Sequence, residues 1–142
     1  MITVTIRNLT KNAVYEGRPY TYTITVETPE GAKIPVEASG DTLGEDDIGS
    51  TIRIAVEAQS MQPIEITADS AAKLIPGEYD SVDIYGRVIG IDADTEYPLE
   101  IGLDGGSLRA YVRDIESVDD RDWVVITGAQ LYLRDIEPLP EG

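Results

Sequence analysis

Residues 22–36 read Tyr22-Thr-Ile-Thr-Val26, Pro29-Glu-Gly31 and Ala32-Lys-Ile-Pro-Val36, and the same pattern returns as Tyr97-Pro-Leu-Glu-Ile-Gly-Leu103, Asp104-Gly-Gly106 and Leu108-Arg-Ala-Tyr-Val112. Each copy is a strand, a glycine-containing turn and a second strand. The offset between the copies drifts only from about 76 to about 71 residues, which is the pattern of a duplicated β unit with small loop insertions and deletions. The repeat indicates architecture and does not by itself indicate chemistry.

Alternation of apolar and polar residues is the dominant period outside these hairpins. Ile2, Val4 and Ile6 share one face of a strand, while the residues between them are polar. This period predicts half-buried strands, and turn residues separate them. We expect the remaining strands at 20–26, 32–38, 50–58, 63–67, 81–91, 97–103, 107–113, 123–131 and 132–137. The predicted fold class is therefore all-β, with about five strands in each half and little helix.

The repeat also predicts the domain organisation. We expect a first β repeat at 1–68, a linker or short helix at 69–79 and a second β repeat at 80–142. Asp69 or Ser70 would cap the short helix, and Pro76-Gly77 would end it. Because a half of about 70 residues buries only a marginal core, the two repeats are expected to pack against each other.

The run from Asp122 to Pro138 carries a resemblance to a known family. It reads as a strand, a glycine at position 128 and a returning strand that ends in Ile-Glu-Pro. It resembles the closing hairpin of the oligonucleotide/oligosaccharide-binding (OB) fold, a small five-stranded barrel with a longer connection between its third and fourth strands. The resemblance covers residues 81–138 and, more weakly, 2–67. It implies two tandem barrels that bind on the outer face of their second and third strands. Small SH3-like barrels or a sandwich would give a similar pattern.

The charge balance is strongly acidic. The 142 residues include 27 acidic and 11 basic residues, a net charge of −16, with only three lysines and no phenylalanine. A hydrophobic content of 42% in a strand pattern indicates that the chain folds. An Asp-rich, Lys-poor surface resembles proteins of salt-in halophilic archaea and their viruses, in which molar salt screens self-repulsion. An ordinary acidic protein is the alternative.

Several classes of site are disfavoured by composition. The sequence holds no cysteine and no histidine, which removes thiolate chemistry, the usual general base and the commonest metal ligand. It also lacks a nucleophile elbow, a phosphate loop, a dinucleotide fingerprint and zinc spacing. We expect no enzyme activity and no cofactor. Because no apolar leader or membrane-length run is present, we expect a cytoplasmic location, or a particle such as a virion assembled there.

The strongest nucleic-acid signal lies in the second repeat. Because alternate residues of a strand point to opposite faces, Leu108, Ala110 and Val112 are expected to point inward. Arg109, Tyr111 and Arg113 would then point outward and form a stacking platform, with Tyr111 between two cations. The alternative is a solvated, salt-bridged strand face. A turn at Gly105-Gly106 would place Glu100 opposite Tyr111 and diagonal to both arginines.

Two further groups of residues are candidates for binding. The outward residues Thr21, Thr23 and Thr25 lie in the less acidic half, where residues 1–75 carry −5 against −11 for residues 76–142. They are the expected docking surface for a protein partner or a second copy of the chain. Asp92, Asp94 and Glu96 alternate like calcium ligands, but Tyr97 and Leu103 stand where a calcium loop needs Gly and Glu. A loose cation site there competes with plain acidic surface, and we expect no metal.

The leading functional hypothesis is a non-enzymatic structural or interaction module in a larger protein assembly of a halophilic system. A tail, connector or baseplate protein of a virus particle is one such component. The alternative hypothesis is a tandem OB-type protein that binds single-stranded nucleic acid through Arg109, Tyr111 and Arg113.

The halophile hypothesis predicts salt-dependent folding. Lowering potassium chloride from about 1 M to about 0.1 M lengthens the screening distance from about 3 Å to about 10 Å, so repulsion among the carboxylates should loosen or unfold the chain. Far-UV circular dichroism and thermal melts across this range measure the effect. A cooperative fold of equal stability at both salt concentrations would contradict the hypothesis.

Overall fold

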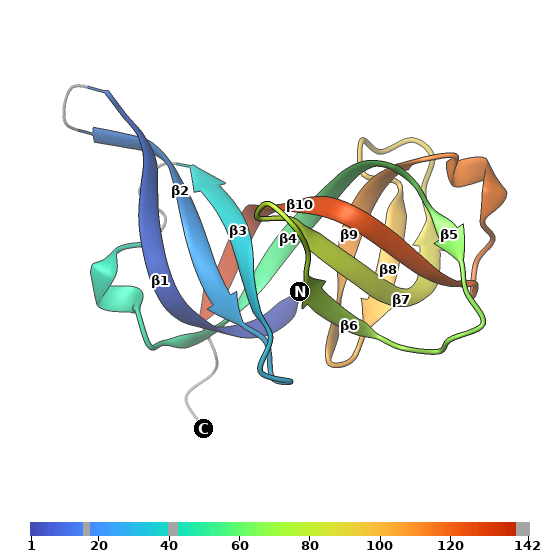
Figure 1. Ribbon diagram of the computed structural model, residues 1–142, viewed down its shortest axis with the longest axis horizontal. Helices are drawn as coiled ribbons and strands as arrows, with labels where there is room; N and C mark the ends of the chain where they lie inside the picture. The colour runs from blue at the N-terminus through green and yellow to red at the C-terminus, as the bar shows by residue number, and fades with distance from the viewer. Residues whose placement is uncertain (16–17, 40–42, 139–142) are drawn as a thin grey trace.

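The computed structural model describes residues 1–15, 18–39 and 43–138, and these residues form an all-β protein (Figure 1). The all-β class and the low helix content are confirmed. The strands are β1 (Ile2–Tyr15), β2 (Arg18–Glu27), β3 (Lys33–Ser39), β4 (Thr51–Pro63), β5 (Glu65–Ile66), β6 (Lys73–Pro76), β7 (Val82–Ile91), β8 (Leu99–Leu103), β9 (Gly106–Arg113) and β10 (Trp123–Pro138), and the two short 3-10 helices are η1 (Glu45–Asp47) and η2 (Ile115–Ser117).

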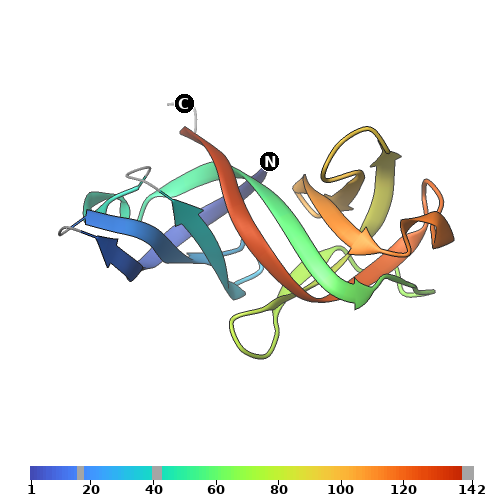
Figure 2. The same cartoon turned by 90° about the horizontal axis from the view of Figure 1, so that it is seen from above.

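The ten strands belong to one sheet, in the order β5-β10-β3-β2-β1-β4-β9-β8-β7-β6, with additional β10–β4 and β10–β7 pairings. The sheet has two lobes, one containing β1 to β3 and the other β6 to β9 (Figure 1). The long strands β4 and β10 run side by side through the middle and reach into both lobes (Figure 2). The two lobes are therefore parts of a single hydrogen-bonded structure.

The pairings close a ring in each lobe. In the first lobe the ring runs β1–β2–β3–β10–β4 and returns to β1. In the second lobe it runs β7–β8–β9–β4–β10 and returns to β7. Each ring contains one parallel contact, β3 with β10 and β4 with β9, and the other contacts are antiparallel. Both rings share the β4–β10 pair.

The prediction of a closing hairpin at 122–138 is wrong. β10 continues from Trp123 to Pro138 without a turn, and β4 continues through the gap that the sequence suggested between 58 and 63. The first junction contains Ser60 and ends at Pro63 but has no Gly, Asn or Asp, and residues 130–133 contain none of the residues common in tight turns. Gly128 instead has a φ of +63° and lies at a register shift between Ile126 and Ala129, so it bends the strand within a bulge.

The sequence predicted a linker or a short helix at 69–79, and the prediction of a helix is wrong. Lys73–Pro76 form β6, which pairs antiparallel with β7 from Lys73 opposite Tyr85 to Pro76 opposite Val82. Leu74 is buried and anchors this edge strand in the core. The free energy gained by burying Leu74 and pairing β6 with β7 outweighs the weak helical propensity of residues 69–75.

The core follows the alternation in the sequence and is continuous between the lobes. Ile2, Val4 and Ile6 are buried as expected, and they belong to the same apolar cluster as side chains of β7 to β9. Where β4 meets β10, the hydroxyl of buried Ser60 donates a hydrogen bond to the Thr127 carbonyl oxygen at 2.7 Å. This bond satisfies a polar group next to the bulge.

The crossing strands predict that the two sequence halves depend on each other for folding. We expect the fragments 1–79 and 80–142 to be unfolded alone, because the first lacks the β10 segment that pairs with β3 and β4 and the second lacks β4. An equimolar mixture should regain the cooperative melt and dispersed amide spectrum of the intact chain. A cooperative melt from either fragment alone would show instead that the halves at 1–68 and 80–142 are independent domains.

Candidate functional site

A row of polar side chains crosses four neighbouring strands on the outside of the second lobe. The register places Tyr132 of β10 opposite Glu57 of β4, Glu57 opposite Arg109 of β9, and Arg109 opposite Glu100 of β8. One step along the strands, Gln59 lies opposite Tyr111. Because residues that alternate along a strand share a face, these two rows form one continuous surface.

Three adjoining hollows lie along this surface and share residues with one another. Their volumes are about 270, 200 and 250 Å³. β4 and β9 form the floor, the 92–98 loop forms one wall, and Arg134 of β10 forms the other. We call this feature the β4–β9 groove; its principal lining residues are Glu57, Gln59, Met61, Glu96, Tyr97, Arg109, Tyr111 and Arg134.

Arg109 holds one wall of the groove in place. Its Nε donates to the Tyr97 carbonyl oxygen at 2.9 Å, and its Nη2 donates to the Thr95 hydroxyl at 3.2 Å. A carboxylate oxygen of Glu100 lies 4.0 Å from its Nη1. The guanidinium is therefore engaged on several sides and fixes the 92–98 loop against β9.

The other arginine of the groove is paired as well. Nε of Arg134 lies 2.8 Å from a carboxylate oxygen of Glu57, and the Arg134 side chain is 69% exposed while that of Glu57 is mostly buried. Both arginines of the described groove thus have a carboxylate neighbour. With Glu57, Glu96 and Glu100 nearby, the groove offers little net positive charge to a phosphate backbone.

Tyr97 lies half-buried between the loop and the groove floor. Burial raises the pKa of its hydroxyl above the ordinary value of 10.0, and the charges of Glu57 and Glu96 and the neighbouring Tyr132 raise it further, while Arg134 lowers it. The hydroxyl therefore stays protonated throughout the neutral range and remains available as a hydrogen-bond donor.

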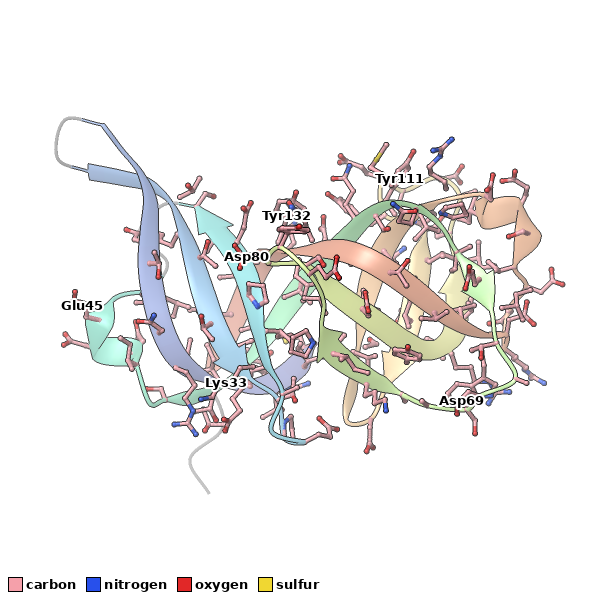
Figure 3. The ribbon with its side chains drawn as sticks, viewed as in Figure 1. Lys33, Glu45, Asp69, Asp80, Tyr111 and Tyr132 are labelled. Atoms are coloured by element: carbon pink, nitrogen blue, oxygen red, sulfur yellow. The ribbon has the colours of Figure 1, made fainter. Side chains whose placement is uncertain are left out.

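Large apolar groups reach solvent at one end of the groove. Met61 is 63% exposed and Tyr111 is 41% exposed, and both line the same hollow as Tyr97. Tyr111 points outward from the upper edge of the second lobe in Figure 3. This end of the groove is an aromatic and thioether surface next to charged residues.

The structure brings together two of the three residues predicted as a stacking platform. Arg109 and Tyr111 both line the groove, while Arg113 is exposed at the end of β9, opposite Pro63. The expected position of Glu100 opposite Tyr111 is wrong. The turn residues are Asp104 and Gly105, with a φ of +87° at Gly105, so Leu103 pairs with Gly106 and Glu100 lies opposite Arg109.

The threonines predicted as a docking surface lie in the other lobe. Thr21, Thr23 and Thr25 are half-buried on β2 and pair with Ser39, Glu37 and Pro35 of β3. β1 and β4 separate β2 from β9 in the sheet. The structure therefore does not combine these threonines with Arg109 and Tyr111 in one site.

The carboxylates considered for a loose cation site are exposed in the 92–98 loop. A carboxylate oxygen of Asp92 accepts a bond from the Asp94 backbone N–H at 3.2 Å, and the Asp92 carbonyl oxygen accepts one from the Thr95 hydroxyl at 3.0 Å. Glu96 faces the groove instead. Within residues 1–15, 18–39 and 43–138, no group of three or more acidic side chains is gathered closely enough to hold a metal ion.

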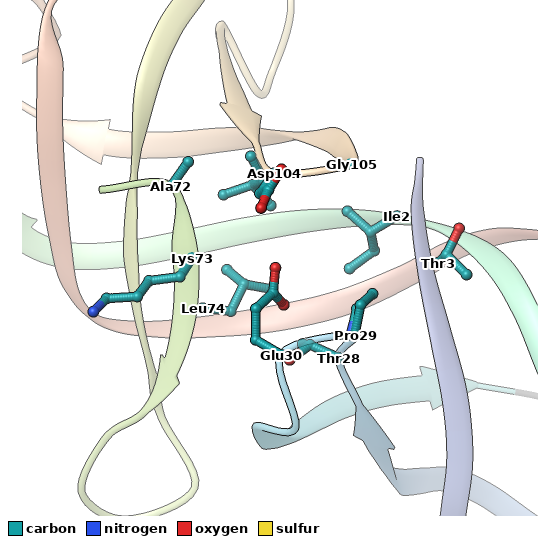
Figure 4. Close-up of a pocket in the computed structure, with 11 residues that line it drawn as sticks. Ile2, Thr3, Thr28, Pro29, Glu30, Ala72, Lys73, Leu74, Asp104 and Gly105 are labelled. Atoms are coloured by element: carbon teal, nitrogen blue, oxygen red, sulfur yellow. The ribbon is translucent and has the colours of Figure 1, made fainter. Parts of the chain in front are cut away.

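A second, deeper hollow lies where the lobes meet, and Figure 4 shows the residues around it. Ile2, Leu74 and Leu103 line its apolar part, while Glu30, Lys73 and Asp104 supply charged groups. Its volume of about 30 Å³ is the space of one or two water molecules. It is too small for an organic ligand, so the β4–β9 groove is the better candidate site.

Sequence reasoning missed most residues of the groove. It singled out Arg109 and Tyr111 by parity on one strand, but the lining also includes Glu57, Gln59, Met61, Tyr97 and Arg134. β4 and β9 come from different halves of the chain and pair in parallel. No local pattern in the sequence indicates that pairing.

Comparisons with known proteins add no relative. No protein-family model, no curated protein and no solved structure matches this chain. Over the part of the chain that the structure describes, no helix has the length and apolar character needed to cross a membrane.

The raised pKa of Tyr97 predicts how alkaline pH affects stability. In the unfolded chain the hydroxyl ionises near 10.0, whereas in the folded chain it still holds its proton there. The folded state then binds more protons, so this contribution to stability is fully present below pH 10 and is lost as pH rises through the folded-state pKa. In chemical denaturation above pH 10, Tyr97→Phe should lose less stability with rising pH than the unmodified chain. Identical slopes would contradict this assignment.

Proposed function

We propose that this chain is a non-enzymatic structural or interaction module of a larger protein assembly, and that it docks a protein partner in the β4–β9 groove. The observation that carries the proposal is the composition of that groove. Tyr97, Tyr111, Met61 and two arginines line it, and it contains no lysine among its described residues. Tyrosine, methionine and arginine are enriched in the centres of protein interfaces, and lysine is depleted there.

The arrangement of charges supports a protein partner over nucleic acid. Arg134 lies 2.8 Å from a carboxylate oxygen of Glu57, and Arg109 lies 4.0 Å from one of Glu100. Because both arginines already have a carboxylate neighbour, a partner does not have to supply negative charge to them. Paired charges at a groove rim select against wrong partners and set the register of docking. The exposed ring of Tyr111 and the exposed side chain of Met61 supply the apolar area that a partner can bury.

The scaffold suits a structural role. We propose that the two closed rings are OB-type barrels that have exchanged their fifth strands, since each ring takes its final strand from the other half of the sequence. Such an exchange links the lobes through many hydrogen bonds rather than through a flexible linker. Within a halophilic assembly, for example a virus particle, a module of this kind would hold two attachment faces at a fixed angle.

Single-strand nucleic-acid binding is the second candidate function. The observation that favours it is the location of the groove, which includes the outer face of β9 next to the 92–98 loop and reaches Glu100 of β8 at one end. The OB resemblance implies ligands at that face and its adjoining loops. Tyr97 and Tyr111 would then serve as stacking platforms for bases.

A peptide selection tests the proposed function. A phage-displayed random peptide library is panned against the immobilised chain in molar potassium chloride, and affinities of the selected peptides are then measured by fluorescence anisotropy. We expect Tyr111→Ala to weaken peptide binding by about tenfold or more, because an exposed aromatic in a groove is a typical hot spot. The matched control Thr25→Ala, an outward residue on β2, should bind the same peptides unchanged.

Three other outcomes of these binding measurements would change the proposal. Equal peptide binding by Tyr111→Ala would refute docking in the groove, and a loss of binding in Thr25→Ala would move the docking surface to β2. Labelled single-stranded oligonucleotides are measured in parallel. Oligonucleotide binding that disappears in Tyr111→Ala, with no selected peptide, would replace the proposal by the second candidate.

A further inference from the structure

One end of the β4–β9 groove combines aromatic, thioether, amide and carboxylate groups, and no described arginine or lysine lines it. This hollow has a volume of about 250 Å³ and is lined by Gln59, Met61, Glu96, Tyr97 and Tyr111. The two arginines of the groove line the neighbouring hollows instead. The volume is smaller than that of pockets that enclose drug-sized ligands, so the hollow suits a single side chain of a partner.

Glu96 gives this hollow a negative charge. Glu57 lies 2.8 Å from Arg134 and Glu100 lies 4.0 Å from Arg109, so these two carboxylates already have cationic neighbours. Among the residues that the structure describes, no ion pair joins Glu96 to an arginine or a lysine. The net charge of −16 also attracts a basic partner at longer range. The charge of the hollow therefore favours a cationic occupant.

The loop that carries this carboxylate is held against β9. Nε of Arg109 donates to the Tyr97 carbonyl oxygen at 2.9 Å, and its Nη2 donates to the Thr95 hydroxyl at 3.2 Å. One guanidinium thus fixes the residues on both sides of Glu96, while the Glu96 side chain remains exposed. A cation from a partner meets a carboxylate whose backbone is already positioned, which lowers the entropic cost of docking.

Two tyrosine rings line the same hollow as this carboxylate. Tyr111 is 41% exposed, and Tyr97 is half-buried. Aromatic rings attract cations to their faces, and arginine is found there more often than lysine. The guanidinium of arginine is planar and weakly hydrated, and it can donate two parallel hydrogen bonds to a carboxylate. A tyrosine ring next to a carboxylate without an ion-pair partner therefore favours arginine over lysine.

We propose that the hollow at the Met61 end of the β4–β9 groove binds an arginine side chain of the protein partner. In this arrangement the guanidinium contacts the Tyr111 ring and donates hydrogen bonds to the Glu96 carboxylate and the Gln59 amide oxygen. The methylene groups of the arginine pack against Met61. The inference rests on the proposed function, because it specifies the chemistry of the partner that docks in the same groove.

Titration of the full chain with short peptides, followed by nitrogen–proton correlation NMR, tests the proposal. The peptides are identical except for a central arginine, lysine, citrulline or glutamate, and citrulline keeps the shape of arginine without its charge. The titrations use the lowest potassium chloride concentration that preserves the native amide spectrum, because salt screens the attraction. We expect the arginine peptide to shift the amide signals of Glu96, Tyr97 and Tyr111 at concentrations up to about 10 mM. The lysine peptide should bind about threefold more weakly, the citrulline peptide at least about tenfold more weakly, and the glutamate peptide should not bind.

A pair of matched variants identifies the carboxylate that binds the arginine. Glu96→Gln keeps the size of the side chain and should weaken binding of the arginine peptide by about fivefold or more. Asp94→Asn removes the same charge from the same exposed loop, but Asp94 is not among the residues that line the groove. This control should bind the arginine peptide as tightly as the unmodified chain does.

Several results would overturn the inference: no binding of the arginine peptide, equal binding of the lysine or citrulline peptide, or an equal effect of the two variants. The peptide selection described above decides the proposed function separately. Selected peptides that need Tyr111 but bind Glu96→Gln unchanged would retain the groove as the docking site and refute the arginine anchor. Binding of the arginine peptide that depends on Glu96, with no peptide selected from the library, would contradict the proposed function alone.

Discussion

The antiparallel pairing of β4 with β10 is the constraint on which the rest of the structure depends. Residues 52–59 pair with residues 130–138, and each strand then continues into the opposite lobe. Without this pair neither ring of strands closes, since each ring contains both strands. A hydrogen-bonded connection of this length couples the two lobes more firmly than the packing of two small domains would, because its polar groups are satisfied only while both lobes are formed.

The same pairing creates the candidate site. β4 leaves β10 and lies parallel to β9, so residues from the two halves of the sequence meet as Glu57 with Arg109 and Gln59 with Tyr111. Arg109 then secures the 92–98 loop through the Tyr97 carbonyl oxygen and the Thr95 hydroxyl. The groove is therefore a consequence of the strand crossing.

The sequence predicted most of the strands and the parity of their side chains, because period-two alternation directly reflects burial on one face. It did not predict where strands end: the sequence suggested breaks between strands at 58–63 and 130–133, but β4 and β10 continue through both positions. It also could not predict that β4 pairs with β9, since a parallel contact between distant strands has no local signature. The residues found from sequence, Arg109 and Tyr111, lie on one strand, and those missed lie on the strands that the crossing brings beside it.

The similarity between the two halves of the sequence lies in the alternating apolar positions, and their outward residues differ. The counterparts of Arg109 and Tyr111 in the first repeat are Lys33 and Pro35, and the hollow at the β3–β10 contact is lined by Thr23, Glu37 and the 79–80 turn instead of an aromatic groove. Because the aromatic groove lies at one of the two parallel contacts, a partner that docks as proposed would engage the second lobe.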